Sequence, residues 1–203
     1  MTESTVYLRD GADGKLVQAS LFDEITVDHL SLWRQQWIPV MQSARSSNPR
    51  GLLPEDIHWD WLRKLSILGG RLGYHCFAII CRSELQGLMI CNDMASARLP
   101  EQFGKALIYI DYLATAPCNR AAINDPPKYR GVGYVFVLAA IETSNEMGYK
   151  SRVGLHSLPG AELFYEQKCG FTRLGEDAAQ QDLTYFEMTK HQAEAFRRNQ
   201  RKQ

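Results

Sequence analysis

The chain has 203 residues, of which 45% are hydrophobic and 23% are charged. This length and composition are typical of one globular domain with a sizeable core. Lysine and arginine together number 23, as do aspartate and glutamate, so the formal net charge is zero. A balanced charge excludes a global field that would attract nucleic acid or an anionic membrane, and any charged partner must be recognised locally.

The cysteines and the first residues indicate the compartment. The five cysteines form no Cys-x-x-Cys pair, and their odd number argues against a disulfide framework or a structural zinc site. Residues 1–4 have neither the basic head nor the apolar core of a secretory signal, and no apolar run is long enough to span a bilayer. We therefore expect a cytoplasmic protein that binds no metal, no nucleic acid and no membrane.

The N-terminal segment contains two short runs of β-favouring residues. Residues 5–8 and 16–21 flank a cluster of turn-forming residues at 10–14. The pattern predicts a small hairpin or a terminal strand within residues 1–21.

Apolar residues recur at helical spacing in the two stretches that follow. In the first, the pattern runs from Leu30 to Met41 and ends in the polar residues 43–51. In the second, Pro54 suits the first turn of a helix, and the apolar positions repeat until the glycine pair at 69–70 stops the pattern. Each stretch predicts one helix.

Strand patterns dominate the middle of the chain. Residues 75–81 and 86–92 are β-favouring runs that predict a hairpin, because only residues 82–85 separate them. Residues 106–115 predict a longer strand that is apolar on both faces, as in the centre of a sheet. Asp111 interrupts this strand, and a carboxylate in such a place is costly unless it is paired or functional.

The C-terminal part predicts a helix, a strand and a hairpin. An apolar stripe that ends at Gly148, a residue suited to a left-handed C-terminal turn, indicates the helix. The helix is expected at residues 134–147, and the strand begins at residue 153. The hairpin is expected to pair residues 171–174 with residues 183–189 around the polar loop 175–182. Together with the earlier elements, they predict an α/β fold.

No linker or internal repeat divides the chain, so we expect one domain over residues 1–189 and a basic C-terminal tail over 190–203. The tail carries enough positive charge to touch an acidic surface, but a frayed, solvated end is the simpler interpretation. Its cations are Arg197, Arg198, Arg201 and Lys202.

The most informative segment is Lys128-Tyr129-Arg130-Gly131-Val132-Gly133-Tyr134, between the predicted strand 106–115 and the predicted helix 134–147. Glycines let backbone amides approach an anion, and the amides that open a helix add donors and the positive end of its dipole. The segment lacks the Gly-Lys-Ser/Thr of a Walker loop and the third glycine of a dinucleotide fingerprint. It predicts a pyrophosphate-binding loop, while a glycine pair that merely permits a tight turn is the alternative.

This loop resembles the Gln/Arg-x-x-Gly-x-Gly/Ala loop of the GNAT acetyltransferase family, which holds the pyrophosphate of acetyl-coenzyme A. Lys128 stands where the family has Gln or Arg, and it keeps a donor there. A second segment, from Gly154 to Phe171, is similar to the family's strand, short helix and Tyr-Glu-…-Gly-Phe ending. The two motifs occur in the family's order, and the resemblance covers roughly residues 76–189.

The resemblance implies a GNAT-type acyl-CoA N-acyltransferase fold, with a mixed, mostly antiparallel sheet flanked by helices. It also implies direct transfer of an acetyl group from acetyl-CoA to a primary amine of a small molecule or a protein, and family members frequently form homodimers. The backbone amides of Leu113, Ala114 and Thr115 would bind pantetheine and polarise the thioester. A non-catalytic acyl-CoA-binding sensor or regulatory module is the alternative.

Tyr165 aligns with the tyrosine that the family often uses as a general acid toward the coenzyme A thiolate. The family commonly places this tyrosine four steps before the glycine, whereas Tyr165 and Gly170 are five apart, so the extra residue would rotate the hydroxyl. Aromatic packing under the last hairpin is the alternative. The family's frequent asparagine is absent, and Ser157 is its expected substitute. The shifted spacing and this absence motivate the sensor alternative.

Two further residues are candidates for deprotonating the acceptor amine. Asp111 would accept the proton or anchor the acceptor, and its alternative is a salt bridge to Arg120, Lys128 or Arg130. His156 would act as a base through a water, and its alternative is a structural histidine with satisfied hydrogen bonds.

The connection at residues 118–127 is longer than the family's usual link. It would cover coenzyme A with Arg120 meeting a phosphate, or shape the acceptor pocket, or form a surface excursion without function. Cys118 in this loop is a candidate nucleophile, although direct transfer is the preferred mechanism. The tryptophans of the early helices, Trp33, Trp37, Trp59 and Trp61, are expected either to pack in the core or to line the acceptor side.

Overall fold

The computed structural model describes residues 2–47 and 54–200. The chain forms two compact units. The first comprises Met1–Ile90 and Tyr112–Val135, and the second comprises Cys91–Asp111 and Phe136–Gln203. Among the described residues, no helix is long and apolar enough to cross a membrane.

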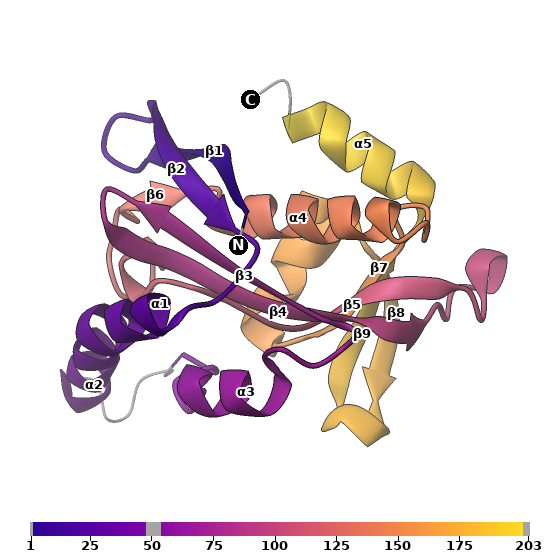
Figure 1. Ribbon diagram of the computed structural model, residues 1–203, viewed down its shortest axis with the longest axis horizontal. Coiled ribbons are helices and arrows are strands. Elements are labelled where there is room, and N and C mark those ends of the chain that lie inside the picture. Colours follow the sequence, from indigo (N-terminus) through magenta and orange to yellow (C-terminus); the bar gives the residue numbers. More distant parts are fainter. Residues whose placement is uncertain (1, 48–53, 201–203) are drawn as a thin grey trace. The chain divides into compact units, whose positions relative to one another are not determined.

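Among the described residues, nine strands form a sheet in the order β6-β1-β2-β3-β4-β5-β7-β9-β8. Figure 1 labels each of these strands. The pair β5–β7 is parallel, whereas β1–β2, β1–β6, β2–β3, β7–β9 and β8–β9 are antiparallel. The expected mixed, mostly antiparallel sheet flanked by helices is therefore confirmed. The strands are β1 (Glu3–Asp10), β2 (Leu16–Phe22), β3 (Tyr74–Cys81), β4 (Glu84–Ser96), β5 (Ala106–Thr115), β6 (Tyr129–Arg130), β7 (Val153–Ser157), β8 (Thr172–Asp177) and β9 (Leu183–Met188).

The predicted N-terminal hairpin is confirmed as β1 and β2, and it holds the segment that leads into the glycine loop. The short strand β6 pairs with the end of β1 through Asp10 and Tyr129. The Gly11 amide donates to the Lys128 carbonyl at 2.8 Å. A Cβ at Gly11 would lie 1.6 Å from the carbonyl oxygen of Pro127, so only glycine fits this close approach.

The first predicted helix is broken into three pieces: α1 (Val27–Leu32), a π-helical turn η1 (Trp33–Trp37) and α2 (Ile38–Ser47). The π turn lies where two neighbouring side chains bond to one strand residue. The Gln36 side-chain oxygen accepts from the Leu85 amide at 2.9 Å, and the Trp37 indole donates to the Leu85 carbonyl at 3.0 Å. Such turns occur as single insertions within α-helices and leave no regular apolar period in the sequence.

The second helix, α3 (Trp61–Leu68), begins seven residues later than Pro54. The expected start was wrong because Asp60 caps the helix, with its carboxylate accepting from the Arg63 amide at 3.0 Å. Residues 55–58 form turns instead, and α3 does not start until Trp61. The expected end is confirmed, because the Gly69 amide donates to the Leu65 carbonyl at 2.7 Å and α3 stops there.

The core of the first unit gathers apolar side chains from α1, η1, α3, β3, β4 and the end of β5. Trp33, Trp37 and Trp61 are all buried in it, which confirms core packing for these three. Trp59 and Tyr112 are only partly buried and pack against this cluster.

In the second unit, the expected strand at residue 153 is β7, and the expected hairpin is β8 with β9. The expected long helix is α4 (Val132–Glu146), which begins in the first unit. Gly148 follows it with φ +76°, as expected for a left-handed turn. The short helix after β7 consists of a 3-10 turn, η4 (Pro159–Ala161), and a π-helical turn, η5 (Phe164–Cys169).

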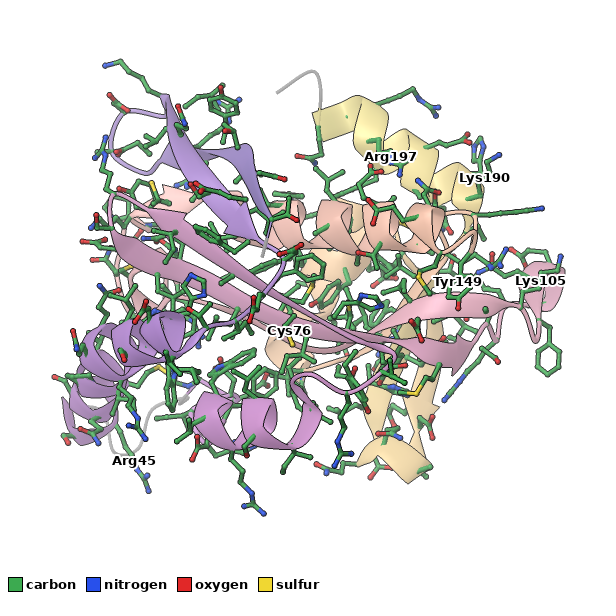
Figure 2. The ribbon with its side chains drawn as sticks, viewed as in Figure 1. Arg45, Cys76, Lys105, Tyr149, Lys190 and Arg197 are labelled. Atoms are coloured by element: carbon green, nitrogen blue, oxygen red, sulfur yellow. The ribbon has the colours of Figure 1, made fainter. Side chains whose placement is uncertain are left out.

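The C-terminal segment differs from the expected frayed end. Lys190–Gln200 forms the helix α5, which buries Ala193 and Phe196. Arg197, labelled in Figure 2, makes an ion pair at 2.9 Å with Glu142 of α4. Of the four cations named for the tail, Arg201 and Lys202 lie outside the described residues.

Candidate functional site

The glycine loop turns directly into the start of α4 (Val132–Glu146). Gly131 connects β6 to α4 with φ +103°, a conformation that disfavours any side chain. The Val135 amide donates to the Gly131 carbonyl at 3.0 Å. Because the first amides of a helix have no acceptor within the helix, the amides of Val132 and Gly133 remain the predicted donors to an external anion.

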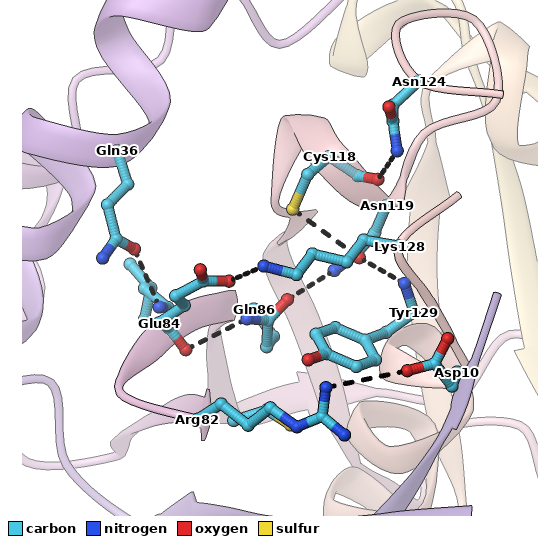
Figure 3. Close-up of polar contacts among 12 residues, drawn as sticks. Asp10, Gln36, Arg82, Glu84, Gln86, Cys118, Asn119, Asn124, Lys128 and Tyr129 are labelled. Carbon is cyan, nitrogen blue, oxygen red and sulfur yellow. Dashed lines mark hydrogen bonds and ion pairs between the residues drawn. The ribbon is translucent and has the colours of Figure 1, made fainter. Parts of the chain in front are cut away.

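The side chain of Lys128 makes an ion pair with Glu84 (Figure 3). Both side chains are 40% exposed. The hydrogen bond to the Glu84 carboxylate raises the pKa of Lys128, so the side chain is firmly cationic. A phosphate that recruited Lys128 would have to take it from Glu84, whereas the loop amides need no such exchange.

Two polar side chains that were not predicted from the sequence hold the segment at Tyr129, which precedes the glycine loop. Asn119 accepts from the Tyr129 amide at 2.8 Å and donates to the Gln86 side-chain oxygen at 2.9 Å. Gln86 is fully buried and donates to the Glu84 carbonyl at 3.1 Å (Figure 3). Each is a single residue without a recognisable motif around it, and their link depends on contacts far apart in sequence.

The long connection at residues 118–127 closes on itself, since the Lys128 amide donates to the Cys118 carbonyl at 2.8 Å. Arg120 in this loop forms a bidentate ion pair with Asp56, in which Nη1 donates to Oδ1 at 2.6 Å and Nη2 donates to Oδ2 at 2.7 Å. It also donates twice to the Thr115 carbonyl, at 2.9 and 2.7 Å. In this structure the guanidinium joins Asp56 to β5, and a contact of Arg120 with a phosphate stays a prediction.

Cys118 is half-buried, and burial raises the pKa of its thiol. A thiol is a nucleophile only as the thiolate, so this shift opposes the nucleophile role.

Leu113, Ala114 and Thr115 form the last part of β5. The parallel ladder between β5 and β7 joins Ile108, Tyr109 and Ile110 to Val153, Gly154 and Leu155. In the described structure its last rung lies at Ile110, and β5 continues to Thr115. This end of β5 is tied down by the Ala116 amide, which donates to the Gln86 carbonyl at 2.8 Å.

In the second unit, four side chains form a hydrogen-bonded chain. The Tyr109 hydroxyl lies 2.6 Å from His156 Nδ1, and His156 Nε2 lies 3.1 Å from Asp177 Oδ2. Arg98 Nη1 donates to the same carboxylate oxygen at 2.6 Å. We call Tyr109, His156 and Asp177 the relay.

The environment fixes the charges of the relay. Burial lowers the pKa of His156, whose side chain is 4% exposed, so the ring is neutral near pH 7. The pKa of Asp177 is lowered to about 2, mainly by the hydrogen bond from Arg98, so this carboxylate is charged. A charged Asp177 places the ring proton on Nε2, which leaves Nδ1 to accept from the Tyr109 hydroxyl. The relay can therefore take up a proton that arrives at Tyr109.

Asp111 accepts a hydrogen bond from Asn92 Nδ2 at 2.8 Å, and Asn92 Oδ1 in turn accepts from the Met94 amide at 3.0 Å. Two of the cations considered as its partners pair elsewhere, Arg120 with Asp56 and Lys128 with Glu84. Asp111 is only partly buried, so its role as a proton acceptor or anchor stays a prediction.

Tyr165 is 6% exposed and packs against aromatic rings, with the Phe171 centroid 5.7 Å away at an interplanar angle of 81°. Burial raises the pKa of its hydroxyl. The extra residue before Gly170 is accommodated by the π turn η5, in which the Gly170 amide donates to the Tyr165 carbonyl five residues back. The insertion thus widens the turn after Tyr165. Ser157, the expected substitute for the missing asparagine, donates to the Leu158 carbonyl at 2.8 Å.

No set of three or more histidine, cysteine, aspartate or glutamate side chains among residues 2–47 and 54–200 is arranged to hold a metal ion.

The sequence itself matches no protein-family model and no curated protein. The structure, in contrast, is similar to many solved ones. The GNAT domain of PAT from S. lividans is 16% identical, with 92% of this chain and 96% of that chain covered and a TM-score of 0.54. PaiA N-acetyltransferase from Thermoplasma acidophilum, solved in complex with coenzyme A, is 13% identical, with 84% and 98% covered and a TM-score of 0.51.

A third similar structure is FeeM, an N-acyl amino acid synthase from uncultured soil microbes. It is 10% identical, with 87% of this chain and 93% of that chain covered and a TM-score of 0.55. At such identities the likeness shows the fold. Together with the loop and helix geometry described above, it confirms that the chain has the fold of the GNAT acetyltransferases.

Proposed function

We propose that this protein is an N-acyltransferase that transfers an acetyl group from acetyl-CoA directly to a primary amine of a small molecule or a protein. The observation that carries the proposal is the glycine loop on a GNAT fold, with Gly131 at φ +103° turning β6 into the first amides of α4. A diphosphate fits this geometry, because helix-start amides and the helix dipole both favour an anion.

Within the proposal, the amides of Val132 and Gly133 hold the diphosphate of the acyl donor. The end of β5, from Leu113 to Thr115, supplies backbone groups for the pantetheine and the thioester carbonyl. Polarised donors at a developing oxyanion are commonly the largest contribution to such catalysis.

The reaction forms a C–N bond and breaks the thioester C–S bond, so one proton must leave the amine and one must reach the departing thiolate. The relay is suited to the first task, because the neutral His156 accepts a proton through Tyr109 while Asp177 stabilises the charged ring. Tyr165 remains the proposed acid for the thiolate. Asp111, held by Asn92, remains the proposed anchor of the acceptor amine.

A second candidate is a non-catalytic acyl-CoA sensor on the same fold. One observation favours it: Tyr165 and His156, two of the proposed catalytic groups, are almost fully buried. In such a module the loop would bind the acyl donor, and no amine would be acylated.

The test measures release of free coenzyme A thiol from acetyl-CoA with a broad panel of primary amines. We expect at least one amine to be acetylated, and we expect Tyr109→Phe and Tyr165→Phe each to lower kcat by about 10²-fold or more, as for removal of an acid or base. Tyr7→Phe, on an exposed side chain of β1, is the matched control and should leave kcat unchanged. Binding of acetyl-CoA without acetylation of any amine, and without effect of either substitution, would establish the sensor instead.

A further inference from the structure

Trp59 and Tyr112 form a half-buried aromatic corner in the first unit. Their ring centroids lie 5.1 Å apart with an interplanar angle of 82°, so two ring faces meet almost at a right angle. Trp61 is buried in the core and packs against Trp59, with the two ring centroids 6.1 Å apart. Both corner rings keep part of their surface in contact with solvent.

An ammonium group already occupies this corner. The Nζ of Lys64, on the first turns of α3, lies 3.3 Å from the Tyr112 centroid and 4.7 Å from the Trp59 centroid. Both distances are within the range at which the negative face of an aromatic ring attracts a cation, and two such faces around one ammonium is the arrangement of alkylammonium-binding sites.

The corner is held in shape by Arg120. Its guanidinium pairs with Asp56 and also binds the Thr115 carbonyl of β5. The backbone carbonyl of Asp56 accepts from the Trp59 amide at 2.9 Å, and Thr115 lies three residues after Tyr112 on the same strand. Arg120 therefore joins the segment that carries one ring to the strand that carries the other, and the corner does not depend on Lys64 for its form.

Lys64 itself is poorly placed to be the acylated amine. The ring faces stabilise the charged ammonium, whereas attack on a thioester requires the neutral amine. What the corner recognises is the cation. Tyr112 immediately precedes Leu113, the first residue of the proposed thioester-binding segment, so a cation held on Tyr112 would lie beside the acyl donor.

We propose that Trp59 and Tyr112 form a binding site for an alkylammonium group of the acceptor, and that Lys64 fills this site when no acceptor is bound. The acceptor would then carry two amino groups or an amine and a quaternary ammonium, one held as a cation in the corner and the other acylated. This inference rests on the proposed function for the identity of the ligand, but the cation site can be tested without it.

The test uses tetramethylammonium as the probe and ligand-observed NMR titration as the measurement. Lys64→Met removes the internal cation and keeps an apolar stem on α3. We expect this variant to bind tetramethylammonium at least fivefold more tightly than the wild type, and we expect tert-butanol, the uncharged analogue of similar shape, not to bind. Lys105→Met, an exposed lysine of the second unit, is the matched control and should behave like the wild type.

A second variant locates the site. Trp59→Leu, introduced together with Lys64→Met, should weaken binding of the probe at least tenfold, and Trp59→Phe should restore part of it. The proposal is overturned if Lys64→Met binds the probe no more tightly than the wild type, if tert-butanol binds as well, or if removal of the Trp59 ring changes nothing.

Calorimetry with acetyl-CoA on the same variants separates this proposal from the proposed function. If the protein binds acetyl-CoA but Lys64→Met gains no affinity for tetramethylammonium, the cation site alone is wrong. If Lys64→Met gains that affinity but no variant binds acetyl-CoA, the acyltransferase function is wrong and the corner is a cation site of another kind.

Discussion

At Tyr109, His156 and Asp177, neighbouring groups fix both the charge and the tautomer of a histidine. Arg98 keeps Asp177 ionised, Asp177 holds the proton on Nε2, and burial keeps the ring neutral. The same side chain in water would be partly charged near pH 6.5. The position of His156 in this hydrogen-bonded chain, more than its residue type, makes it a candidate base.

The lowered pKa of His156 predicts how stability depends on pH. Folding favours the neutral ring, so its contribution is fully present above the unfolded pKa of about 6.5 and is lost as the pH falls through and below that value. The free energy of unfolding is measured with urea at pH 7.5 and at pH 5.5. We expect it to fall less between these two pH values in His156→Gln than in the wild type.

The control for this prediction is His58→Gln, because His58 is exposed. That variant should lose as much stability as the wild type between the two pH values. An equal loss in the wild type and in His156→Gln would show that the ring is not held neutral by the fold.

Single residues could be predicted from the sequence only where a motif marked them. The glycine loop and Tyr165 stand in recognisable patterns, but Asp177 lies within residues 175–182, which were expected to be a loop and instead include the end of β8. Arg98 and Asp177 meet across 79 positions of sequence. Their contact joins the end of β8 to the segment that follows β4, and no local pattern encodes it.

At the scale of elements, the two π-helical turns explain where local periodicity failed. Each adds a residue within an otherwise helical stretch, η1 before Ile38 and η5 before Gly170. In η5 the added residue accounts for the five-step spacing between Tyr165 and Gly170. A spacing that departs from a motif can thus be absorbed by one wide turn without unfolding the helix around it.

The turn between β3 and β4 carries strain that a substitution can release. Arg82 and Ser83 have φ +49° and +63°, although neither is a glycine. Two-residue hairpin turns of this kind require positive φ at both positions. We expect Ser83→Gly to raise the free energy of unfolding by about 0.5 to 1 kcal/mol, as the released strain exceeds the added entropy of the unfolded chain.

The matched variant is Ser66→Gly, at an exposed position inside α3, where the same substitution should lower the free energy of unfolding by about 0.5 kcal/mol. Urea unfolding of both variants measures whether the free energy of unfolding rises for Ser83→Gly and falls for Ser66→Gly. Destabilisation by both would mean that the hairpin turn is not strained.

Element boundaries could be predicted where a strong period met a clear stop, as for β5 and for the end of α3 at Gly69. The start of α3 was misplaced because Pro54 and Asp60 are both good helix-start residues, and tertiary contacts of Asp56 keep the intervening residues in turns. The helix α5 was missed because its polar composition obscures the two positions, Ala193 and Phe196, that it buries.

At the scale of the whole molecule, the fold could be predicted because two motifs occur in a fixed order along one α/β pattern. The role of the N-terminal hairpin could not. It lies outside the resembling region, yet Gly11 and Asp10 contact the segment that leads into the glycine loop. These contacts could not be predicted from the sequence, because they join residues more than a hundred positions apart.

The most direct measurement is a calorimetric titration of acetyl-CoA into the wild type, Gly131→Ala and Gly148→Ala. Both glycines have positive φ, at +103° and +76°, and both have room for a Cβ, but only Gly131 sets the direction of the loop amides. We predict saturable binding by the wild type, at least tenfold weaker binding by Gly131→Ala, and binding within twofold of the wild type by Gly148→Ala. Absence of binding by the wild type, or an equal loss in both variants, would contradict the account.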